Sequence, residues 1–166
     1  MERVFISAGS NLGDRQANLE RALVTLDMKG VLLKKRSSLF ETEPVGFRDQ
    51  PWFLNMAVEV ETYMPALDLL KVCHEIENAH GRVRTFRGAP RSLDLDILFY
   101  GDRVIHTDGL RIPHPRLTER RFVLEPLAEI APEFVHPLLG ESVRRLLEVC
   151  PDIAVVRPFN RGDVPR

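Results

Sequence analysis

Disulfides and membrane spans are the first features that this sequence lacks. Its 166 residues include only two cysteines, Cys73 and Cys150, which are too few for a disulfide framework. No apolar run approaches the roughly 20 residues that cross a bilayer. The first apolar run, residues 4–6, has neither the length nor the basic lead-in of a secretory signal. We therefore expect buried thiols, a reducing compartment (the cytoplasm) and no association with membranes.

Several common functional motifs are also missing. No Cys-x-x-Cys or His-Glu-x-x-His spacing indicates a zinc site, and no Ser-His-Asp arrangement stands out. Residues 9–14 form neither a Walker loop nor the Gly-x-Gly-x-x-Gly of dinucleotide sites, and a turn followed by a helix cap accounts for them. Because repeats and long linkers are absent too, we expect one compact domain over residues 1–160 and a polar tail over 161–166.

Lysine is scarce, and arginine carries most of the positive charge. Only four of the 23 basic residues are lysine, and nine arginines fall between residues 82 and 121, a stretch without any lysine. The formal net charge of −1 argues against a protein that coats nucleic acid. Arginine, however, offers a planar fork of donors that fits phosphate or carboxylate oxygens. A solvated surface explains any single arginine, whereas the cluster as a whole favours a phosphate site.

The hydrophobic pattern predicts an α+β fold of the ferredoxin-like kind. Alternation and short apolar runs indicate four strands, at residues 4–8, 31–42, 52–61 and 93–100. Helical spacing indicates one helix between the first two strands and another between the last two. The resulting order, β-α-β-β-α-β, predicts an antiparallel sheet with its helices on one face. Short helices around 124–130 and 142–150 would be small C-terminal additions.

Residue types at the helix ends support this prediction. Asn11 or Asp14 would cap the first helix, and Gly30 would end it. Pro65 would stand at the first position of the second helix. The inward faces are apolar in both helices, with Leu19, Ala22, Leu23 and Leu26 on the first and Ala66, Leu69, Leu70, Cys73 and Ile76 on the second.

The fourth predicted strand carries two carboxylates. Asp94 and Asp96 would share one face with Cβ atoms about 7 Å apart, since side chains alternate along a strand. Leu93, Leu95, Ile97 and Phe99 would share the other face. Two hard oxygen ligands on a rigid element suit Mg²⁺, although a solvated strand face is the alternative. Arginines on both sides favour a site for metal and phosphate: Arg82, Arg84, Arg87, Arg91, Arg120 and Arg121.

The third predicted strand carries a second candidate pocket. Phe53, Asn55 and Ala57 share one face, opposite to Leu54, Met56, Val58 and Val60. An aromatic ring and an amide two residues apart suit a planar heterocycle, whereas a second-layer phenylalanine beside a surface asparagine is the alternative. The loop at 42–46 would add backbone donors and acceptors, and Phe122 would close the other side. His114, held between two prolines near the arginine cluster, would contact a phosphate.

At this point the sequence resembles the 6-hydroxymethyl-7,8-dihydropterin pyrophosphokinases of folate biosynthesis. Six stretches carry the resemblance in order between about residue 3 and residue 158: 7–14, 38–46, 49–55, 77–84, 90–98 and 113–127. The most specific is Pro-Arg-Ser-Leu-Asp-Leu-Asp-Ile-Leu at 90–98. The resemblance implies transfer of the terminal diphosphate of ATP to the hydroxymethyl oxygen of the pterin, with release of AMP.

The resemblance also implies a role for individual residues. The catalytic residues would be Asp94 and Asp96, holding two Mg²⁺, and Arg82 and Arg91, stabilising charge on the moving diphosphate. ATP would be contacted by His74, Glu77, Arg84, Arg91, Ile97, His114 and Arg120. The pterin would lie between Phe53 and Phe122, with Asn55 on its edge and further contacts from Thr42, Pro44 and Val45. We expect a monomer whose partners are ATP and the pterin, with neither nucleic acid nor membrane.

Two stretches depart from the family pattern, and one rival function stays open. Residues 87–89 are one residue shorter than in relatives and lack their aromatic, and His74 stands where some relatives have glutamine. The rival is a non-catalytic ligand-sensing or RNA-binding domain, since ferredoxin-like folds also serve those functions. RNA binding by this fold usually needs exposed aromatics and a basic sheet, whereas Asp94 and Asp96 would repel phosphate unless metal intervenes.

Overall fold

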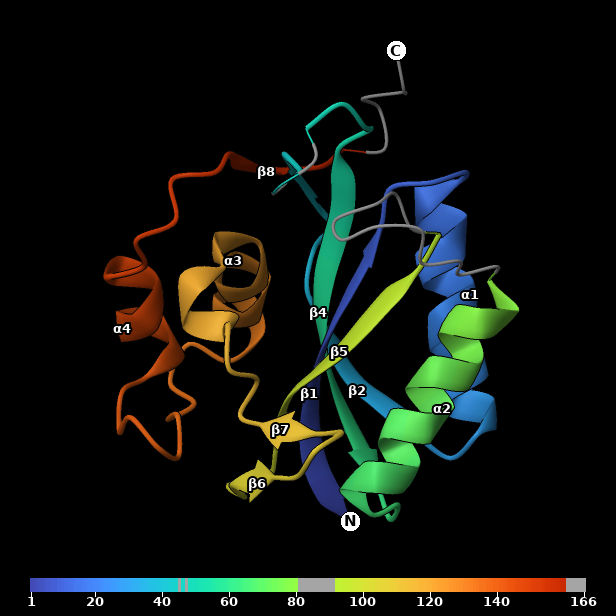
Figure 1. Ribbon diagram of the computed structural model, residues 1–166, viewed down its shortest axis with the longest axis vertical. Coiled ribbons are helices and arrows are strands. Elements are labelled where there is room, and N and C mark those ends of the chain that lie inside the picture. Colours follow the sequence, from blue (N-terminus) through green and yellow to red (C-terminus); the bar gives the residue numbers. More distant parts are fainter. Residues whose placement is uncertain (45, 47, 81–91, 161–166) are drawn as a thin grey trace.

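Figure 1 shows a computed structural model of the chain, in which one antiparallel sheet lies between helices on both of its faces. It describes residues 1–44, 46, 48–80 and 92–160. Within this part of the chain the main sheet has the order β5-β1-β4-β3-β8, and β2 also pairs with β4. The predicted ferredoxin-like α+β class is confirmed. The strands are β1 (Glu2–Ser10), β2 (Leu32–Arg36), β3 (Phe40–Thr42), β4 (Phe53–Thr62), β5 (Asp94–Tyr100) and β8 (Val156–Pro158).

The second predicted strand is divided into β2 and β3. β2 pairs with the second half of β4 and β3 with the first half, so both lie along the same edge. At the break, the Ser37 N–H donates to the Ala57 carbonyl (2.9 Å), and the Ser37 Oγ accepts from the Ala57 N–H (2.9 Å). Because a serine side chain replaces a backbone partner here, the regular ladder is interrupted. One continuous strand over 31–42 is therefore wrong in this detail.

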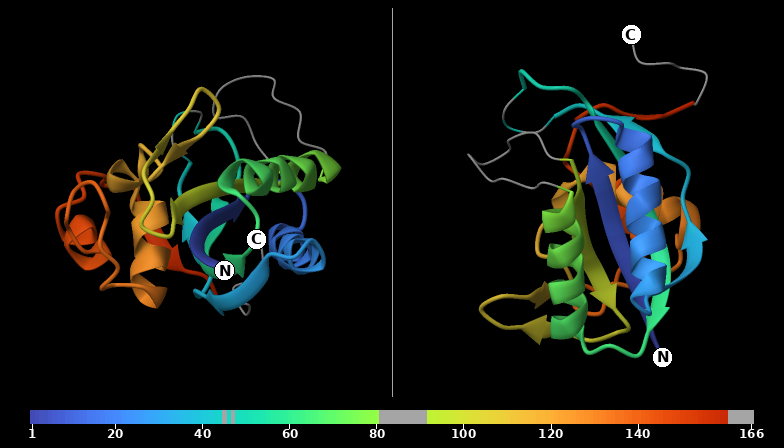
Figure 2. Two further views of the ribbon diagram at one scale, coloured as in Figure 1. Left: turned by 90° about the horizontal axis from the view of Figure 1, so that it is seen from below. Right: turned by 90° about the vertical axis from the view of Figure 1, so that its right-hand side faces the viewer.

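Two helices, α1 (Arg15–Met28) and α2 (Ala66–Ala79), cover one face of the sheet (Figure 2). Their predicted inward faces are confirmed, because residues such as Leu19 and Leu69 are buried in one core with β1, β4 and β5. Asp14 caps α1, since its Oδ1 accepts from the Ala17 N–H at 3.1 Å. Pro65 is the N-cap of α2, one position before the predicted place.

The opposite face of the sheet is covered by the C-terminal helices. α3 (Arg121–Ile130) and α4 (Val143–Glu148) pack there with the short helix η1 (Leu117–Glu119), as Figure 1 shows to the left of the sheet. This second core contains Phe5 and Ala57 from the sheet and Leu124 and Leu127 from α3. The two predicted helices thus lie on one face, as expected, and the C-terminal additions, for which no face was predicted, cover the other. The reason is that the second face is itself apolar and must be buried.

An irregularity in β5 explains why this face is apolar. Ile97 pairs with Ile6 and Phe99 pairs with Phe5, so Leu98 is an extra residue in β5. Such a bulge interrupts the alternation of side chains. Leu98 and Phe99 both lie in the second core, whereas Ile97 lies in the first. The prediction that Phe99 shares a face with Ile97 is therefore wrong.

The last described segment returns from α4 to the sheet and ends beside β3. There β8 pairs antiparallel with β3, far in sequence but next to the loop that leaves β3. A small hairpin of β6 (Ile105–His106) and β7 (Arg111–Ile112) lies at the other end of the sheet (Figure 1). Across the described ranges, no helix combines the length and the hydropathy that crossing a bilayer would require.

Truncating Leu127 tests whether the second core is an integral part of the fold. The side chain is 0% exposed, so Leu127→Ala is expected to lower the free energy of unfolding by about 2–5 kcal/mol, through lost burial and the cavity left behind. Leu138→Ala, at a side chain 63% exposed, is the control and should change it by less than about 0.5 kcal/mol. Urea denaturation measures both. Equal, small losses would mean that α3 is loosely attached.

Candidate functional site

The candidate site lies where β1 ends and where β4 and β5 begin, at the upper end of Figure 1. In the sheet register, Gly9 of β1 stands opposite Asp94 of β5 on one side and Asn55 of β4 on the other. Directly paired residues share a face, so these three form one row across the sheet. Asp94 and Asn55 are thus about 10 Å apart, twice the spacing of neighbouring strands. The predicted carboxylate pair and the predicted ring pocket therefore share one surface.

A second row lies one step further along the strands. It consists of Asp96, Ser7 and Ala57, again paired across β5, β1 and β4. Ala57 belongs to the core beneath α3, so both rows face the C-terminal helices rather than α1 and α2. Asp94 and Asp96 are half-buried, on the face opposite to Leu93, Leu95 and Ile97 of the first core. The predicted common face of the two carboxylates is confirmed.

Arg120 and His114 come close to the carboxylates from the segments before α3. Burial lowers the pKa of Arg120, while the charges of Asp96 and Asp94 act on it in the opposite direction. Burial also lowers the pKa of His114 to about 4, helped by the charge of Arg120 and opposed by that of Asp94. Two candidate phosphate ligands and two candidate metal ligands thus gather at one place, from segments about 20 residues apart in sequence.

The backbone holds His114 in this position. Its N–H donates to the carbonyl of Leu98, the extra residue of the bulge, at 3.0 Å. Its Nδ1 accepts from the Arg116 N–H at 3.1 Å, which a neutral ring can do and a protonated one cannot. His114 is therefore a neutral imidazole at physiological pH.

Arg120, the N-cap of α3, and Arg121, its first residue, have different surroundings. The Arg120 guanidinium lies 5.6 Å from the centre of the Phe122 ring, so these two predicted site residues are adjacent. The Arg121 side chain turns to the C-terminal segment, where its Nε donates to the Asp152 carbonyl at 2.9 Å. Its backbone N–H donates to the Asp152 carboxylate at 3.0 Å. Arg120 is thus the arginine on which the charges of Asp96 and Asp94 act, whereas the described contacts of Arg121 are with Asp152, Cys150 and Glu125.

The pterin residues predicted on β3 and β4 are brought together in the fold. Asn55 is 5% exposed, and its Nδ2 donates to the Oγ1 of Thr42 at 2.7 Å. Thr42 in turn pairs with Phe53 in the β3–β4 ladder. Pro44, two residues after Thr42, is buried, and Phe53 is half-buried. The amide, the hydroxyl and the ring therefore come from one small hairpin.

Gly9 is a site residue that sequence reasoning missed, because a turn explained it. A Cβ atom at this position would lie 2.5 Å from Asn55 Oδ1 and 3.7 Å from the Phe53 ring. The absence of a side chain at Gly9 therefore lets the Asn55 amide lie against the β1 backbone, inside the row that leads to Asp94. A glycine inside a strand is the signal for such a close approach, and the predicted strand at 4–8 stopped one residue short of it.

Three predicted ATP contacts lie on α2 or toward it. Glu77 is 2% exposed, and its Oε2 accepts from the Leu95 N–H at 2.8 Å, between the two aspartates. Ile97 packs in the first core, so its side chain is unavailable to a nucleotide, and His74 is exposed on α2.

Burial raises the pKa of the Cys73 thiol to about 12, helped by the Glu77 and Asp96 carboxylates. The expectation of a buried thiol is confirmed for Cys73.

The donor set of the site fits Mg²⁺. The carboxylates of Asp94 and Asp96, two residues apart on one face of β5, are hard oxygen ligands. They would leave further coordination positions of the ion to water and phosphate. In the described ranges, no group of three or more His, Cys, Asp or Glu gathers as a metal cluster. The predictions for Val45, Arg82, Arg84, Arg87 and Arg91 lie outside the described residues.

Fold and site together define a ferredoxin-like α+β domain with its polar groups gathered at one end of the sheet. Residues 5–132 match the family described as 7,8-dihydro-6-hydroxymethylpterin-pyrophosphokinase (HPPK). The chain belongs to this family. It is 49% identical over 127 residues to the Bacillus subtilis 2-amino-4-hydroxy-6-hydroxymethyldihydropteridine pyrophosphokinase, covering 76% of each chain. To the enzyme of the same name from Methylorubrum extorquens it is 44% identical, covering 89% of this chain and 92% of the relative.

Other relatives are much longer proteins. The chain is 43% identical over 160 residues to the folic acid synthesis protein fol1 of Pneumocystis carinii, covering 95% of itself but 22% of that relative. It thus spans about a fifth of fol1. Among solved structures, Plasmodium falciparum HPPK-DHPS superimposes with a TM-score of 0.70 at 17% identity, covering 89% of this chain and 44% of the other. That likeness supports the fold.

Adding a methyl group at Gly9 tests the close approach to Asn55. Gly9→Ala is expected to lower the free energy of unfolding by about 1–3 kcal/mol, because Asn55 is buried and must give up its hydrogen bond to Thr42 to make room. Gly109→Ala is the matched control, since a Cβ there meets nothing within 4 Å. Thermal or urea unfolding compares the two. A loss no greater at Gly9 than at Gly109 contradicts the close approach.

The low pKa of His114 predicts a pH dependence of stability. With the folded-state pKa at about 4 and an unfolded value near 6.5, the unfolded chain binds more protons between these pH values. His114 therefore lowers stability as the pH falls from about 6.5 toward 4. The free energy of unfolding should therefore fall less between pH 7 and pH 4.5 in His114→Asn than in the wild type. Urea denaturation without metal or nucleotide measures it. The exposed His106→Asn is the control. An unchanged slope in His114→Asn would refute the assignment.

Proposed function

We propose that this chain transfers the terminal diphosphate of ATP to 6-hydroxymethyl-7,8-dihydropterin, giving the pterin diphosphate and AMP. The observation that carries the proposal is the row Asp94–Gly9–Asn55, which supports it because a candidate metal ligand and a candidate ligand for a flat ring lie on the same face of the sheet. Membership of the pyrophosphokinase family supports it. The match to the Methylorubrum extorquens 2-amino-4-hydroxy-6-hydroxymethyldihydropteridine pyrophosphokinase, which covers 89% of this chain and 92% of that relative, supports it too.

The pterin would be bound by the β3–β4 hairpin. Asn55 and Thr42 would hydrogen-bond to its polar edge, while Phe53 and Phe122 would stack on its two faces. Pro44 and Val45 would complete the contacts, as the family resemblance implies.

The phosphates would be bound between the carboxylates and the residues before α3. Asp94 and Asp96 would hold Mg²⁺, two ions by the family resemblance, which when bound neutralises phosphate charge and orients the oxygens. Arg120 would donate to phosphate oxygens as a cation, and neutral His114 as a hydrogen-bond donor. His74 and the backbone at Ile97 would contact ATP, as the family resemblance implies. Arg84 is proposed as a further phosphate ligand, with Arg82 and Arg91 beside the moving diphosphate, all on the family resemblance.

The chemistry would be a direct displacement. The hydroxymethyl oxygen forms a bond to the β-phosphorus of ATP as the bond from that phosphorus to the bridging α,β-oxygen breaks. The hydroxyl proton is released, and AMP leaves with the bridging oxygen. No covalent intermediate is needed, so positioning and electrostatic stabilisation supply the rate. Glu77 would contribute by holding the Leu95 N–H, which fixes the strand between the two aspartates.

The RNA-binding rival lacks the open sheet that it needs. α1 and α2 cover one face of the described sheet, and α3 and α4 cover much of the other. Of the aromatic residues on that face, Phe5 and Phe99 are 0% exposed and Phe53 is half-buried. Recognition of RNA by such a fold uses exposed aromatics for stacking. The remaining rival, a sensor that binds the ligands without turnover, is an outcome of the experiment below.

We also propose that the chain works as one domain over residues 1–160 and as a monomer in the cytoplasm. The single sheet, shared by both cores, supports the first point. A relative from Pisum sativum is named a mitochondrial folate synthesis bifunctional protein, so the compartment is to be measured for this chain.

Asp96→Ala tests the metal site and the reaction together. The protein is mixed with ATP, Mg²⁺ and the hydroxymethyl-dihydropterin, and the nucleotide product is separated. The wild type should form AMP, and Asp96→Ala should form it at least about 100-fold more slowly, the scale for removing one preorganised electrostatic group. Asp102→Ala, at an exposed turn, is the control.

Each other outcome has a distinct meaning. ADP in place of AMP would identify an ordinary kinase, and binding of both ligands without turnover would identify the sensor. Full activity of Asp96→Ala would remove that residue from the metal site while leaving the reaction in place.

A further inference from the structure

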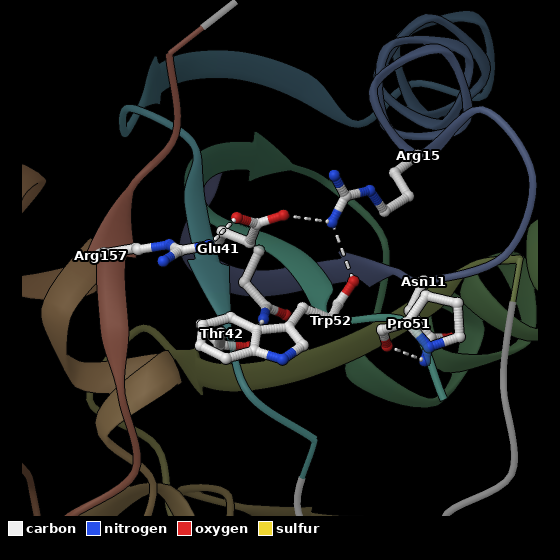
Figure 3. A network of polar contacts seen from close by, with 8 residues as sticks. Asn11, Arg15, Glu41, Thr42, Pro51, Trp52 and Arg157 are labelled. Atoms are coloured by element: carbon white, nitrogen blue, oxygen red, sulfur yellow. Dashed lines mark hydrogen bonds and ion pairs between the residues drawn. The ribbon is translucent and has the colours of Figure 1, made fainter. Parts of the chain in front are cut away.

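We propose that Glu41, held between Arg15 and Arg157, is a positioning residue for the pterin half of the site, and that through it the C-terminal strand β8 sets the shape of that half. We call these three residues the Glu41 clamp. Figure 3 shows these three residues together with Thr42 and Trp52, which lie at the end of β3 and just before β4. The inference rests on the proposed function, because the hairpin is where the pterin would bind.

Each oxygen of the Glu41 carboxylate has its own arginine. Arg15 Nη1 donates to Oε2 at 2.9 Å, and Arg157 Nη2 donates to Oε1 at 2.9 Å (Figure 3). The side chains of Glu41 and Arg15 are only 19% and 14% exposed, whereas that of Arg157 is 60% exposed. Because the Glu41–Arg15 pair is largely shielded from water, removing one member leaves the other charge poorly compensated, and this contact is unlike a fully exposed ion pair.

Arg15 ties together the two strands from which the pterin residues project. The same Nη1 also donates to the Trp52 carbonyl at 2.9 Å. Trp52 directly precedes Phe53, and Glu41 directly precedes Thr42, which is the cross-strand partner of Phe53. One guanidinium at the start of α1 therefore fixes both strands at the step where the loop between them leaves the sheet.

Asn11 adds a second link between the same loop and the start of α1. Its Nδ2 donates to the Pro51 carbonyl at 2.9 Å and to Gln50 Oε1 at 2.8 Å. The loop end that enters β4 is thus held at two consecutive points, by Asn11 at Pro51 and by Arg15 at Trp52. These contacts restrain Phe53 and Asn55, which follow within four residues.

The C-terminal strand completes the clamp from the outer side. Arg157 of β8 pairs with Glu41 of β3 in the ladder, and its guanidinium lies 4.6 Å from the centre of the Trp52 ring. A guanidinium over an indole face is attracted by the ring quadrupole. The backbone adds two bonds beyond the ladder, from Glu43 N–H to the Val155 carbonyl (3.1 Å) and from Val155 N–H to Glu43 Oε1 (2.8 Å).

Glu41 stays ionised, so it can keep its ion pairs with both arginines. Burial raises the pKa of its carboxyl, but the hydrogen bonds and charges of Arg157 and Arg15 outweigh burial and hold the pKa below its ordinary value. Glu41 is thus ionised throughout the physiological range. An amide at this position keeps the shape of the side chain and loses the charge that both arginines require.

The test compares Glu41→Gln and Arg157→Ala with the wild type. Because the clamp acts on the hairpin and not on the carboxylate row, KM for the pterin should rise about tenfold in each variant. KM for ATP and kcat at saturating pterin should stay within about twofold. Arg157→Lys keeps the positive charge beside Glu41 but loses the planar guanidinium over Trp52, so it should recover part of the loss. Glu20→Gln, in the ion pair with Arg36 on the exposed side of α1, is the control and should change neither KM.

Trp52 provides a readout that needs no turnover. It is the sole tryptophan of the chain, so the emission spectrum reports the ring beneath Arg157. Emission without ligands should shift in Arg157→Ala and Glu41→Gln and stay constant in Glu20→Gln. If Glu41→Gln fails to fold, Arg157→Ala carries the test, because its side chain is largely exposed.

Failure of the inference is distinguishable from failure of the proposed function. A wild type that forms no AMP overturns the proposed function, and the inference with it. An active wild type with unchanged pterin KM in Glu41→Gln and Arg157→Ala overturns the positioning role alone. Equal rises in both KM values would show a general loss of structure and would overturn it too.

Discussion

The hydrogen bonding of β1 on both sides is the constraint on which the rest of the structure depends. Along its length β1 pairs with β4, and over most of it also with β5. This register sets Asp94 and Asn55 on either side of Gly9. A shift by one residue would turn every side chain to the other face, so the two halves of the site would separate. The site therefore owes its geometry to a ladder whose own side chains are mostly core residues.

Burial on both faces of the sheet follows from the same ladder. The bulge at Leu98 turns two successive apolar side chains of β5 toward the second face, and Phe5 stands opposite Phe99 there. That face requires the cover that α3 provides. The same bulge supplies the carbonyl that holds His114, and the start of α3 carries Arg120 and Phe122. A packing requirement thus also brings the candidate phosphate ligands, His114 and Arg120, to the carboxylates.

Much of this arrangement could be predicted from local pattern. The alternation at 53–60 assigned Asn55 to the face opposite Leu54 and Met56, and the alternation at 93–97 assigned Asp94 and Asp96 to the face opposite Leu93 and Leu95. Such patterns succeed because the side-chain period of a strand is fixed by its backbone. They fail where one extra or irregular residue shifts the alternation of side chains between the two faces. Leu98 breaks the period in β5, and Ser37 breaks the second strand through a side-chain bond that no hydrophobic pattern records.

The sequence by itself determined the class of fold, the faces of its strands and helices, and the family to which the chain belongs. It did so because periodicity and motif spacing are local properties of the chain. Only the tertiary structure decided that Gly9 separates Asp94 from Asn55, that the charges of the carboxylates act on Arg120 while Arg121 contacts Asp152, and that Arg157 reaches Glu41 from β8. Those relations join residues up to 116 positions apart, and they depend on strand order and packing, which leave no periodic trace in the sequence.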